Sequence, residues 1–165
     1  PDESIIAGNR ITNLRQVMKA RGVKCKCIRC REAKEKLEVR SKKLKIIKYK
    51  ASGGIEYFLS YESKDGKVLY GFCRLRLENT TPLTPLVRGA AMIRELHVYG
   101  ELVPVGKNKK IQHAGLGKGL MREAEKIARQ KGYKKIAVIA GVGARGYYRK
   151  LGYKLQSSYM VKNLV

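Results

Sequence analysis

A glycine-bearing stretch that leads straight into an amphipathic helix constrains this chain more than any other feature of its sequence. Residues 112–117 have the sequence QHAGLG, and residues 118–130 follow with apolar side chains on one face and charged ones elsewhere. A helix start offers unpaired N–H groups and a partial positive charge, and glycines let an anion approach the backbone closely. The stretch therefore predicts a phosphate-binding loop before a helix that packs on a sheet, although plain loops share this spacing.

Basic residues dominate the composition. The 165 residues carry a net charge of +24, and residues 1–50 hold 16 of the 37 lysines and arginines. This excess predicts a polyanionic partner such as nucleic acid, although an anionic membrane surface would also attract it. No apolar run reaches the roughly 20 residues of a membrane span and no signal peptide is visible, so we expect a soluble cytoplasmic protein without a membrane partner. Because the chain starts at Pro1, we expect a processed chain or a fragment.

The order of predicted elements indicates a mixed α/β fold. Asp65-Gly66 between two β-rich segments is typical of a hairpin, and Pro82 and Pro85 indicate a loop. We predict strands over 44–49, 55–61, 68–77 and 91–99, a helix over 118–130, a strand over 135–140, a short helix over 144–151 and a last strand over 153–161. This is a β-meander followed by β-α-β-α-β. A basic arm, residues 1–42, with a helix over 9–20, precedes the domain, residues 43–165.

The arm contains a tight cysteine cluster. Cys25, Cys27 and Cys30 are spaced as ligands of a soft metal, and zinc requires four ligands. Cys73, in a predicted strand, is the remaining cysteine and would complete a structural site if the arm folds back onto the sheet. A buried strand cysteine is the alternative for Cys73. The spacing also leaves an iron–sulfur cluster open, whereas a disulfide fits a reducing compartment poorly.

Five segments together resemble one protein family. They are residues 6–10 (IAGNR), 94–100 (RELHVYG), 112–117 (QHAGLG), 139–153 (IAGVGARGYYRKLGY) and 159–162 (YMVK). The element order resembles the GNAT acyltransferase fold. The segments resemble the acetyltransferase-like domain of the Elongator catalytic subunit, in the tRNA uridine acetyltransferase family, and we expect an archaeal or bacterial member.

The resemblance implies an acetyl-CoA-dependent enzyme that modifies the wobble uridine of tRNA at C5. In that family a radical-SAM domain with an iron–sulfur cluster performs the radical chemistry, and the GNAT-like domain holds and hydrolyses the thioester. These 165 residues have no room for the radical-SAM domain. We therefore expect neither SAM nor its cluster here, only binding of acetyl-CoA and RNA and hydrolysis of the thioester.

The resemblance also indicates site residues. Tyr147 and Tyr148 are candidates to protonate the departing thiolate or to position the thioester or its attacking water, although one of the two is expected to be a packing residue. Glu95 and His97 share a face of their strand and are candidate bases for water, although a strand histidine is more often structural. The expected acetyl-CoA contacts are Leu96, His97, Val98, Gln112, His113, Ala114, Gly115, Leu116, Gly117, Lys118 and Gly119, with Tyr147 and Tyr148. His113 either contacts phosphate or caps the loop, and Arg122 adds charge.

Other basic residues fit two ligands. Lys107, Lys109 and Lys110, like the basic residues of the arm, are candidates to contact RNA or the 3′-phosphate of coenzyme A. Two further functions compete with the tRNA-modifying one. The first is a protein lysine acetyltransferase of the same fold, which the basic composition disfavours, and the second is a non-catalytic zinc module that binds RNA.

Overall fold

The computed structural model describes residues 14–33, 41–78, 88–99 and 115–164. The chain divides into two compact units, Pro1–Arg31 and Glu32–Val165, so the division falls before the predicted boundary at residue 42. No described helix is long and apolar enough to cross a membrane.

Unit 1 contains two short helices among its described residues, α1 (Leu14–Ala20) and α2 (Ile28–Arg31). Helix α1 ends at a left-handed glycine, because Gly22 has φ 67° and donates its N–H to the carbonyl of Lys19 at 3.1 Å. The predicted helix began at residue 9, and residues 9–13 lie outside the described part. Leu14 and Val17 are 56% and 44% exposed, so α1 has almost no core of its own.

The described residues of unit 2 form a seven-stranded sheet in the order β1-β2-β3-β4-β5-β7-β6. Its strands are β1 (Lys43–Ala51), β2 (Gly54–Glu62), β3 (Leu69–Glu78), β4 (Ala90–Val98), β5 (Lys135–Ile139), β6 (Lys154–Gln156) and β7 (Tyr159–Asn163). Strands β4 and β5 pair in parallel, and every other neighbouring pair is antiparallel. The mixed α/β sheet that the element order predicted is confirmed.

Local turn chemistry explains the meander. Ser52 and Gly53 both have positive φ, 44° and 75°, which matches a two-residue hairpin turn between β1 and β2. At the predicted Asp65-Gly66 turn, Gly66 has φ 70° and donates its N–H to the carbonyl of Ser63 at 2.9 Å. The carboxylate of Asp65 accepts a bond from the Ser63 hydroxyl at 2.6 Å. This hairpin between β2 and β3 is therefore confirmed.

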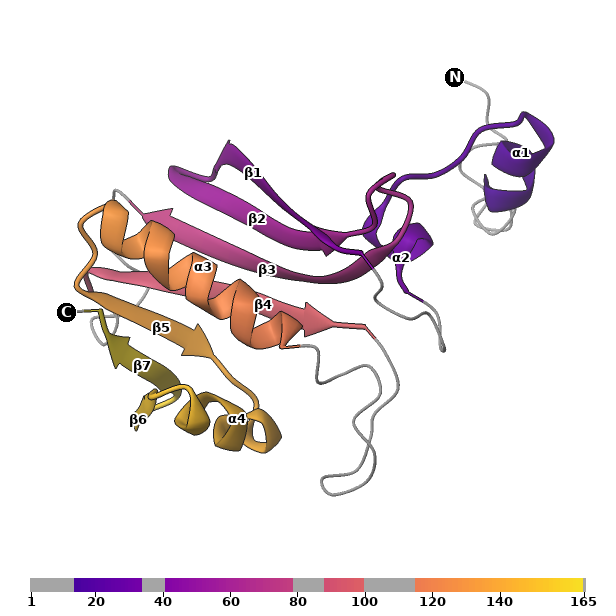
Figure 1. Ribbon diagram of the computed structural model, residues 1–165. Coiled ribbons are helices and arrows are strands. Elements are labelled where there is room, and N and C mark those ends of the chain that lie inside the picture. The colour runs from indigo at the N-terminus through magenta and orange to yellow at the C-terminus, as the bar shows by residue number, and fades with distance from the viewer. Residues whose placement is uncertain (1–13, 34–40, 79–87, 100–114, 165) are drawn as a thin grey trace, which may run out of the picture. The chain divides into compact units, whose positions relative to one another are not determined.

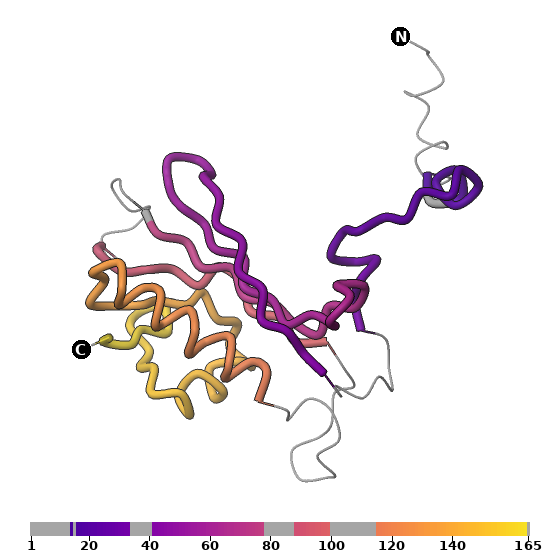
Figure 2. The backbone as a smooth tube through the Cα atoms, turned by 45° about the horizontal axis from the view of Figure 1, so that its top comes forward, coloured from indigo at the N-terminus to yellow at the C-terminus, as the bar shows by residue number. Residues whose placement is uncertain are grey.

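Helix α3 (Leu116–Gln130) runs across the strands on one side of the sheet (Figures 1 and 2). Leu120, Ala124 and Ala128 are fully buried on its inner side, at the spacing of one helical face. They pack against alternate residues of the strands, including Leu59 of β2 and Leu75 of β3. The six-residue helix α4 (Arg145–Lys150), which follows a 3-10 turn (η4, Val142–Ala144), contributes Tyr148 to the same core.

One predicted element is wrong in detail. A single last strand was expected over 153–161, but the structure has a hairpin of β6 and β7 with Gln156 opposite Tyr159. Ser157 adopts φ 53°, which turns the chain back on itself after only three residues of β6. Leu155 lies opposite Met160, and Ser157 and Ser158 form the turn.

Candidate functional site

The sheet opens between its two parallel strands. Among the described residues, β4 pairs with β5 only over Ala90–Ile93, whereas it pairs with β3 as far as Val98. A register shift in the β3–β4 ladder leaves Arg94 as an extra residue between Ile93 and Glu95. Such a bulge bends its strand and disrupts pairing locally. The far half of β4, which includes Leu96 to Val98, therefore offers a backbone edge that β5 does not use.

Helix α3 begins beside this opening. Its N-cap is Gly115, which is left-handed at φ 68°, a conformation that favours glycine. The N–H of Gly119 donates to the carbonyl of Gly115 at 2.8 Å, and the preceding helical N–H groups have no partner within the helix. Lys118 and Arg122 are exposed one turn apart. Gln112, His113, Ala114 and the three lysines at 107, 109 and 110 lie outside the described residues.

Tyrosine hydroxyls lie against two glycines of this helix. A Cβ atom added to Gly117 would lie 2.7 Å from the hydroxyl of Tyr147 and 3.5 Å from a methyl group of Val98. A Cβ atom on Gly119 would lie 2.7 Å from the hydroxyl of Tyr61. The sequence interpretation assigned Gly117 to the approach of a phosphate, and the structure shows that this glycine also makes room for a phenol. The helix starts two residues earlier than predicted, so both glycines lie within it.

The two adjacent tyrosines have different surroundings. Tyr147 is 40% exposed, whereas Tyr148 is 6% exposed and its ring packs edge-on against Tyr153 at 5.9 Å between centroids. Burial raises the pKa of Tyr148 to about 12 and raises the pKa of Tyr147 as well, so both phenols hold their protons at neutral pH. Of the two hydroxyls, the structure brings that of Tyr147 to the start of α3.

Glu95 and His97 lie on the opposite face of the sheet from α3. Glu95 is paired with Arg74 across the ladder, and their side chains approach to 3.6 Å. The His97 ring stacks on Phe72 at 6.0 Å and lies 4.5 Å from the ring of Tyr99. Leu96, between them, packs toward the α3 core. The structure thus brings Glu95 and His97 to one face, as predicted, while Tyr147 stands on the other.

Arg145 is a residue that sequence reasoning missed. Its Nε atom is buried and has no hydrogen-bond partner among the described residues. A buried polar nitrogen without a partner is costly, unless a ligand or water supplies an acceptor. Arg145 is the first residue of α4, two positions before Tyr147. The sequence signal was an arginine beside the tyrosine pair, but its lack of a protein partner is visible only in the structure.

Cys25, Cys27 and Cys30 come together in unit 1, with their sulfur atoms within 4.8 Å of one another. Hydrogen bonds among the three thiols lower the pKa of Cys27 to about 7 and raise the pKa of Cys30 to about 11, and a thiolate is the form that binds metals. Cys73 lies in unit 2 with no exposed surface, and burial raises its pKa to about 12. Its burial fits the alternative of a buried strand cysteine, and the role of Cys73 as fourth ligand stays a prediction.

Comparisons with known proteins agree with this architecture. The model of the acetyltransferase (GNAT) family matches residues 28–153. Elongator complex protein 3 of Bos taurus is 45% identical over an alignment of 177 residues, gaps included, which covers 99% of this chain and 32% of that protein. The tRNA uridine(34) acetyltransferase of Methanocaldococcus jannaschii is 40% identical, with 99% of this chain and 33% of that protein covered.

A solved structure shares the fold. The Elp3 of Methanocaldococcus infernus, with its first 46 residues deleted, superposes with a TM-score of 0.77 and 37% identity over 90% of this chain and 38% of that one. The chain thus spans about a third of the length of the curated relatives that it matches. With its helix start, its open β4 edge and the family match over most of its length, the chain belongs to the acetyltransferase (GNAT) family.

Proposed function

We propose that this chain binds acetyl-CoA in the opening between β4 and β5 and hydrolyses its thioester. The observation that carries the proposal is the position of the Tyr147 hydroxyl, over Gly117 and beside Val98, where the open edge of β4 meets the start of α3. The helix N–H groups from Leu116 to Lys118, together with Arg145, would hold the phosphates. The edge from Leu96 to Val98 would bind the amides of the pantetheine arm as an added strand does.

Tyr147 and Glu95 then divide the proton transfers. Hydrolysis forms a C–O bond from water and breaks the C–S bond, which releases acetate and a thiol. We place the thioester in the opening itself, where Glu95 from one face of the sheet accepts the proton of the attacking water and the Tyr147 hydroxyl from the other face donates one to the departing sulfur. Arg74 lies 3.6 Å from the Glu95 carboxylate and holds it in position on β4. The raised pKa of Tyr147 keeps its proton available until the sulfur takes it. His97 remains the second candidate base on β4.

We propose that this reaction serves the modification of the wobble uridine of tRNA by a larger enzyme. The relative from M. jannaschii carries the name tRNA uridine(34) acetyltransferase, and 99% of this chain aligns with it. The basic residues of the arm and the net charge of +24 support an RNA partner. The radical chemistry would belong to a radical-SAM domain outside these 165 residues.

The cysteine group of unit 1 would hold a structural zinc ion. Three thiols within 4.8 Å of one another suit tetrahedral coordination, with one further ligand required. Metal analysis of the purified chain should give one zinc ion per chain. The Cys27→Ser variant should lose it. If a Cys73→Ala variant stays folded but loses its zinc, Cys73 is the fourth ligand.

One experiment tests the acetyl-CoA proposal directly. Binding is measured by calorimetry and thioester hydrolysis by the release of free coenzyme A, each with tRNA, with a lysine-rich peptide and alone. We expect acetyl-CoA to bind, and tRNA to raise the hydrolysis rate. Tyr147→Phe should lower kcat by roughly 100-fold with little change in affinity, because general acid catalysis contributes on that scale. Tyr159→Phe, on β7, is the matched control and should behave as wild type.

Two outcomes would contradict the proposal. If the chain does not bind acetyl-CoA at high micromolar concentration, the site is not a cofactor site. If the peptide becomes acetylated and tRNA has no effect, the chain is a protein lysine acetyltransferase.

A further inference from the structure

The face of the sheet that points away from α3 carries a charged and aromatic surface. In the described part of unit 2, α3 and Tyr148 of α4 both pack into one core on the other face. Side chains alternate between the two faces along each strand. Glu56 of β2, Arg74 of β3 and His97 of β4 therefore lie together on the face that these helices leave uncovered.

A buried carboxylate organises the charges on this face. Glu56 is 1% exposed. It accepts hydrogen bonds from the Tyr49 hydroxyl at 3.1 Å, from Arg74 at 3.3 Å and from Arg76 at 3.2 Å, and it also binds Arg94. The guanidinium groups come from two different strands, β3 and β4, and converge on one side chain of β2. Glu56 thus fixes the positions of arginines that would otherwise be flexible.

Positive charge remains after these ion pairs. Arg76 is only 12% exposed and also donates to the carbonyls of Ala51 and Ser52 at 3.1 and 2.8 Å, so it is part of the scaffold. Arg74 and Arg94 are 34% and 47% exposed. Two carboxylates, those of Glu56 and Glu95, face three guanidinium groups. Arg74 and Arg94 are therefore held in place, and together they carry positive charge that the two carboxylates do not neutralise. Because their side chains are already fixed, they lose little entropy when an anion binds.

An aromatic row lies next to these arginines. Phe58 stacks on Phe72 at 5.2 Å, Phe72 stacks on His97 at 6.0 Å, and His97 lies 4.5 Å from Tyr99. Phe72 is 2% exposed and forms the buried part of the row, whereas His97 is exposed and Tyr99 is half-buried. Ring faces beside fixed arginines are the combination with which proteins bind unpaired nucleotides.

This surface lies on the same segment of β4 that borders the opening between β4 and β5. Arg94 is the bulged residue at which β4 stops pairing with β5, and His97 follows on the same open segment of β4. A nucleotide bound here would sit on one side of that segment, while Tyr147 stands on the other side. We propose that Arg74, Arg94, His97 and Tyr99 form a nucleotide-binding surface for single-stranded RNA, with the arginines on phosphate and the two rings stacked on bases. This inference rests on the proposed function, which it extends by naming where the RNA acceptor lies.

The test uses the 165-residue chain and a fluorescent single-stranded oligouridylate that carries one 2-aminopurine. Arg94→Gln leaves Glu56 with three partners, so the sheet should stay intact. It should weaken RNA binding severalfold and lower the slope of log Kd against log salt by about 0.7, the loss of one phosphate contact on a single strand. Tyr99→Leu should weaken binding roughly tenfold and relieve the stacking quench of 2-aminopurine, a signal that general destabilisation would not change.

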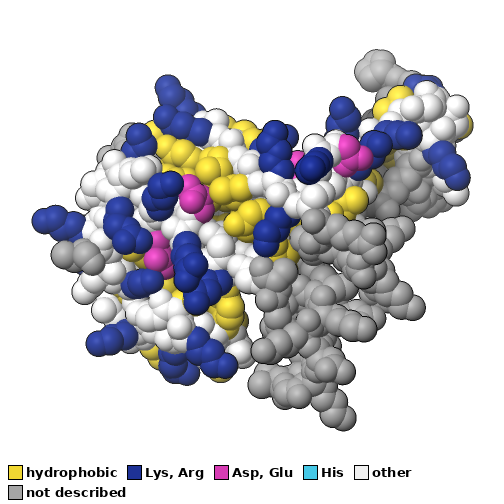
Figure 3. Space-filling view, viewed as in Figure 1, with side chains coloured by type: hydrophobic (Ala, Val, Ile, Leu, Met, Phe, Trp, Pro, Cys, Tyr) yellow, Lys and Arg dark blue, Asp and Glu magenta, His cyan; other side chains and the backbone are white. Residues whose placement is uncertain are grey.

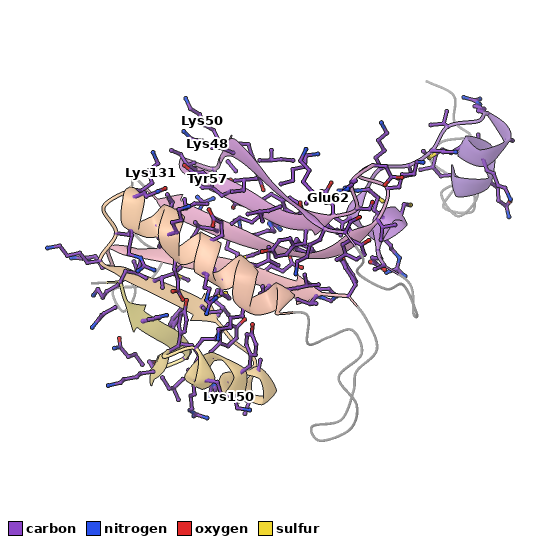
Figure 4. All side chains as sticks on the ribbon, in the orientation of Figure 1. Lys48, Lys50, Tyr57, Glu62, Lys131 and Lys150 are labelled. Carbon is purple, nitrogen blue, oxygen red and sulfur yellow. The ribbon has the colours of Figure 1, made fainter. Side chains whose placement is uncertain are left out.

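Lys131→Gln is the matched control, because it removes the same charge from an exposed position at the C-terminal end of α3, far from the start of that helix (Figure 4). It should change the Kd of RNA by less than about twofold. Acetyl-CoA binding, measured on every variant, should match that of wild type. If Arg94→Gln and Tyr99→Leu bind RNA as Lys131→Gln does, the surface serves another purpose, such as contact with a protein domain, and this inference fails. Failure of wild type to bind acetyl-CoA would instead overturn the proposed function.

Discussion

Two glycines within α3 show how a locally unfavourable residue is retained for its lack of a side chain. Glycine inside a helix costs roughly 0.5–1 kcal/mol relative to alanine. Gly117 and Gly119 both occur within the first four residues of α3, and each makes room for a tyrosine hydroxyl. The start of the helix is therefore less stable than it would be with alanine at these positions. The missing side chains allow two tyrosine hydroxyls to approach the helix backbone.

A substitution at Gly117 should therefore affect the stability of the fold and the rate of thioester hydrolysis differently. Gly117→Ala should leave the melting temperature unchanged or raise it, because the gain in helix propensity offsets the displacement of the half-exposed Tyr147. The same variant should lower thioester hydrolysis, since the hydroxyl of Tyr147 cannot keep its position. Gly119→Ala gains the same propensity but displaces Tyr61, so it should hydrolyse the thioester nearly as wild type does. Equal activities of the two variants would show that the Tyr147 position is irrelevant.

Arg145 allows a prediction about affinity alone. Its buried Nε lacks a partner among the described residues, so an anionic ligand would gain a charge-assisted bond there without competition. Arg145→Gln should raise the Kd of acetyl-CoA roughly tenfold or more, as expected for a lost hydrogen bond to a charged group, and leave unfolding almost unchanged. Arg149→Gln, in the last turn of the same helix, is the control. Calorimetry on both variants decides the matter, and equal affinities would exclude Arg145 from the site.

At the scale of elements, buried carboxylates connect parts of the fold that are distant in sequence. Glu125 of α3 is 4% exposed, accepts a bond from the Tyr153 hydroxyl at 2.9 Å and lies 2.9 Å from the Lys162 ammonium on β7. Glu125→Gln should therefore lower the free energy of unfolding by about 1.5–3 kcal/mol, the range for hydrogen bonds that involve charged groups. Glu123→Gln, whose carboxylate lies 3.7 Å from the ammonium group of the exposed Lys126, should cost less than about 0.5 kcal/mol. Chemical denaturation measures both.

The carboxylate of Glu56 predicts a pH dependence. Burial raises the pKa of Glu56, but hydrogen bonds from Arg94, Tyr49 and Arg76 outweigh it and hold the pKa below the ordinary 4.5. A carboxylate whose pKa is lower in the folded state stabilises the fold above its unfolded pKa, and that stabilisation disappears as the pH falls through the folded value. Unfolding free energy should thus decline steadily below pH 4.5. A Glu56→Gln variant should show a shallower decline, and an identical slope would contradict this account.

Local patterns predict the elements of this fold better than they predict its site. Strand alternation and the Asp65-Gly66 turn are signals between near neighbours, and the meander they predict is present. The arginine partners of Glu56 stand 18, 20 and 38 residues away, so no local pattern reveals them. The difference between Tyr147 and Tyr148 likewise depends on what α4 packs against. Resemblance to a family supplied the site residues, and the structure supplied the faces on which they lie.

At the scale of the whole molecule, charge is spread far beyond any one site. Figure 3 shows many lysine and arginine side chains distributed over the described part of the face that carries α3, with far fewer acidic ones. RNA binding should accordingly depend steeply on salt, with log Kd changing by about 0.7 per phosphate contact against log salt on single strands. Titrations between about 50 and 200 mM salt test this. A flat response would mean that the net charge of +24 does not drive binding.

The short ladder between β4 and β5 has a mechanical consequence. Four residue pairs, Ala90 to Ile93 against Lys135 to Val138, make up the described ladder between the first four strands and the last three. The sheet is thus two half-sheets joined along a short seam, with α3 packed across β2, β3 and β4. A ligand that lays its amides along the free edge of β4 would extend that seam. Such a ligand would hold the two half-sheets together over more positions than the four residue pairs of the described ladder.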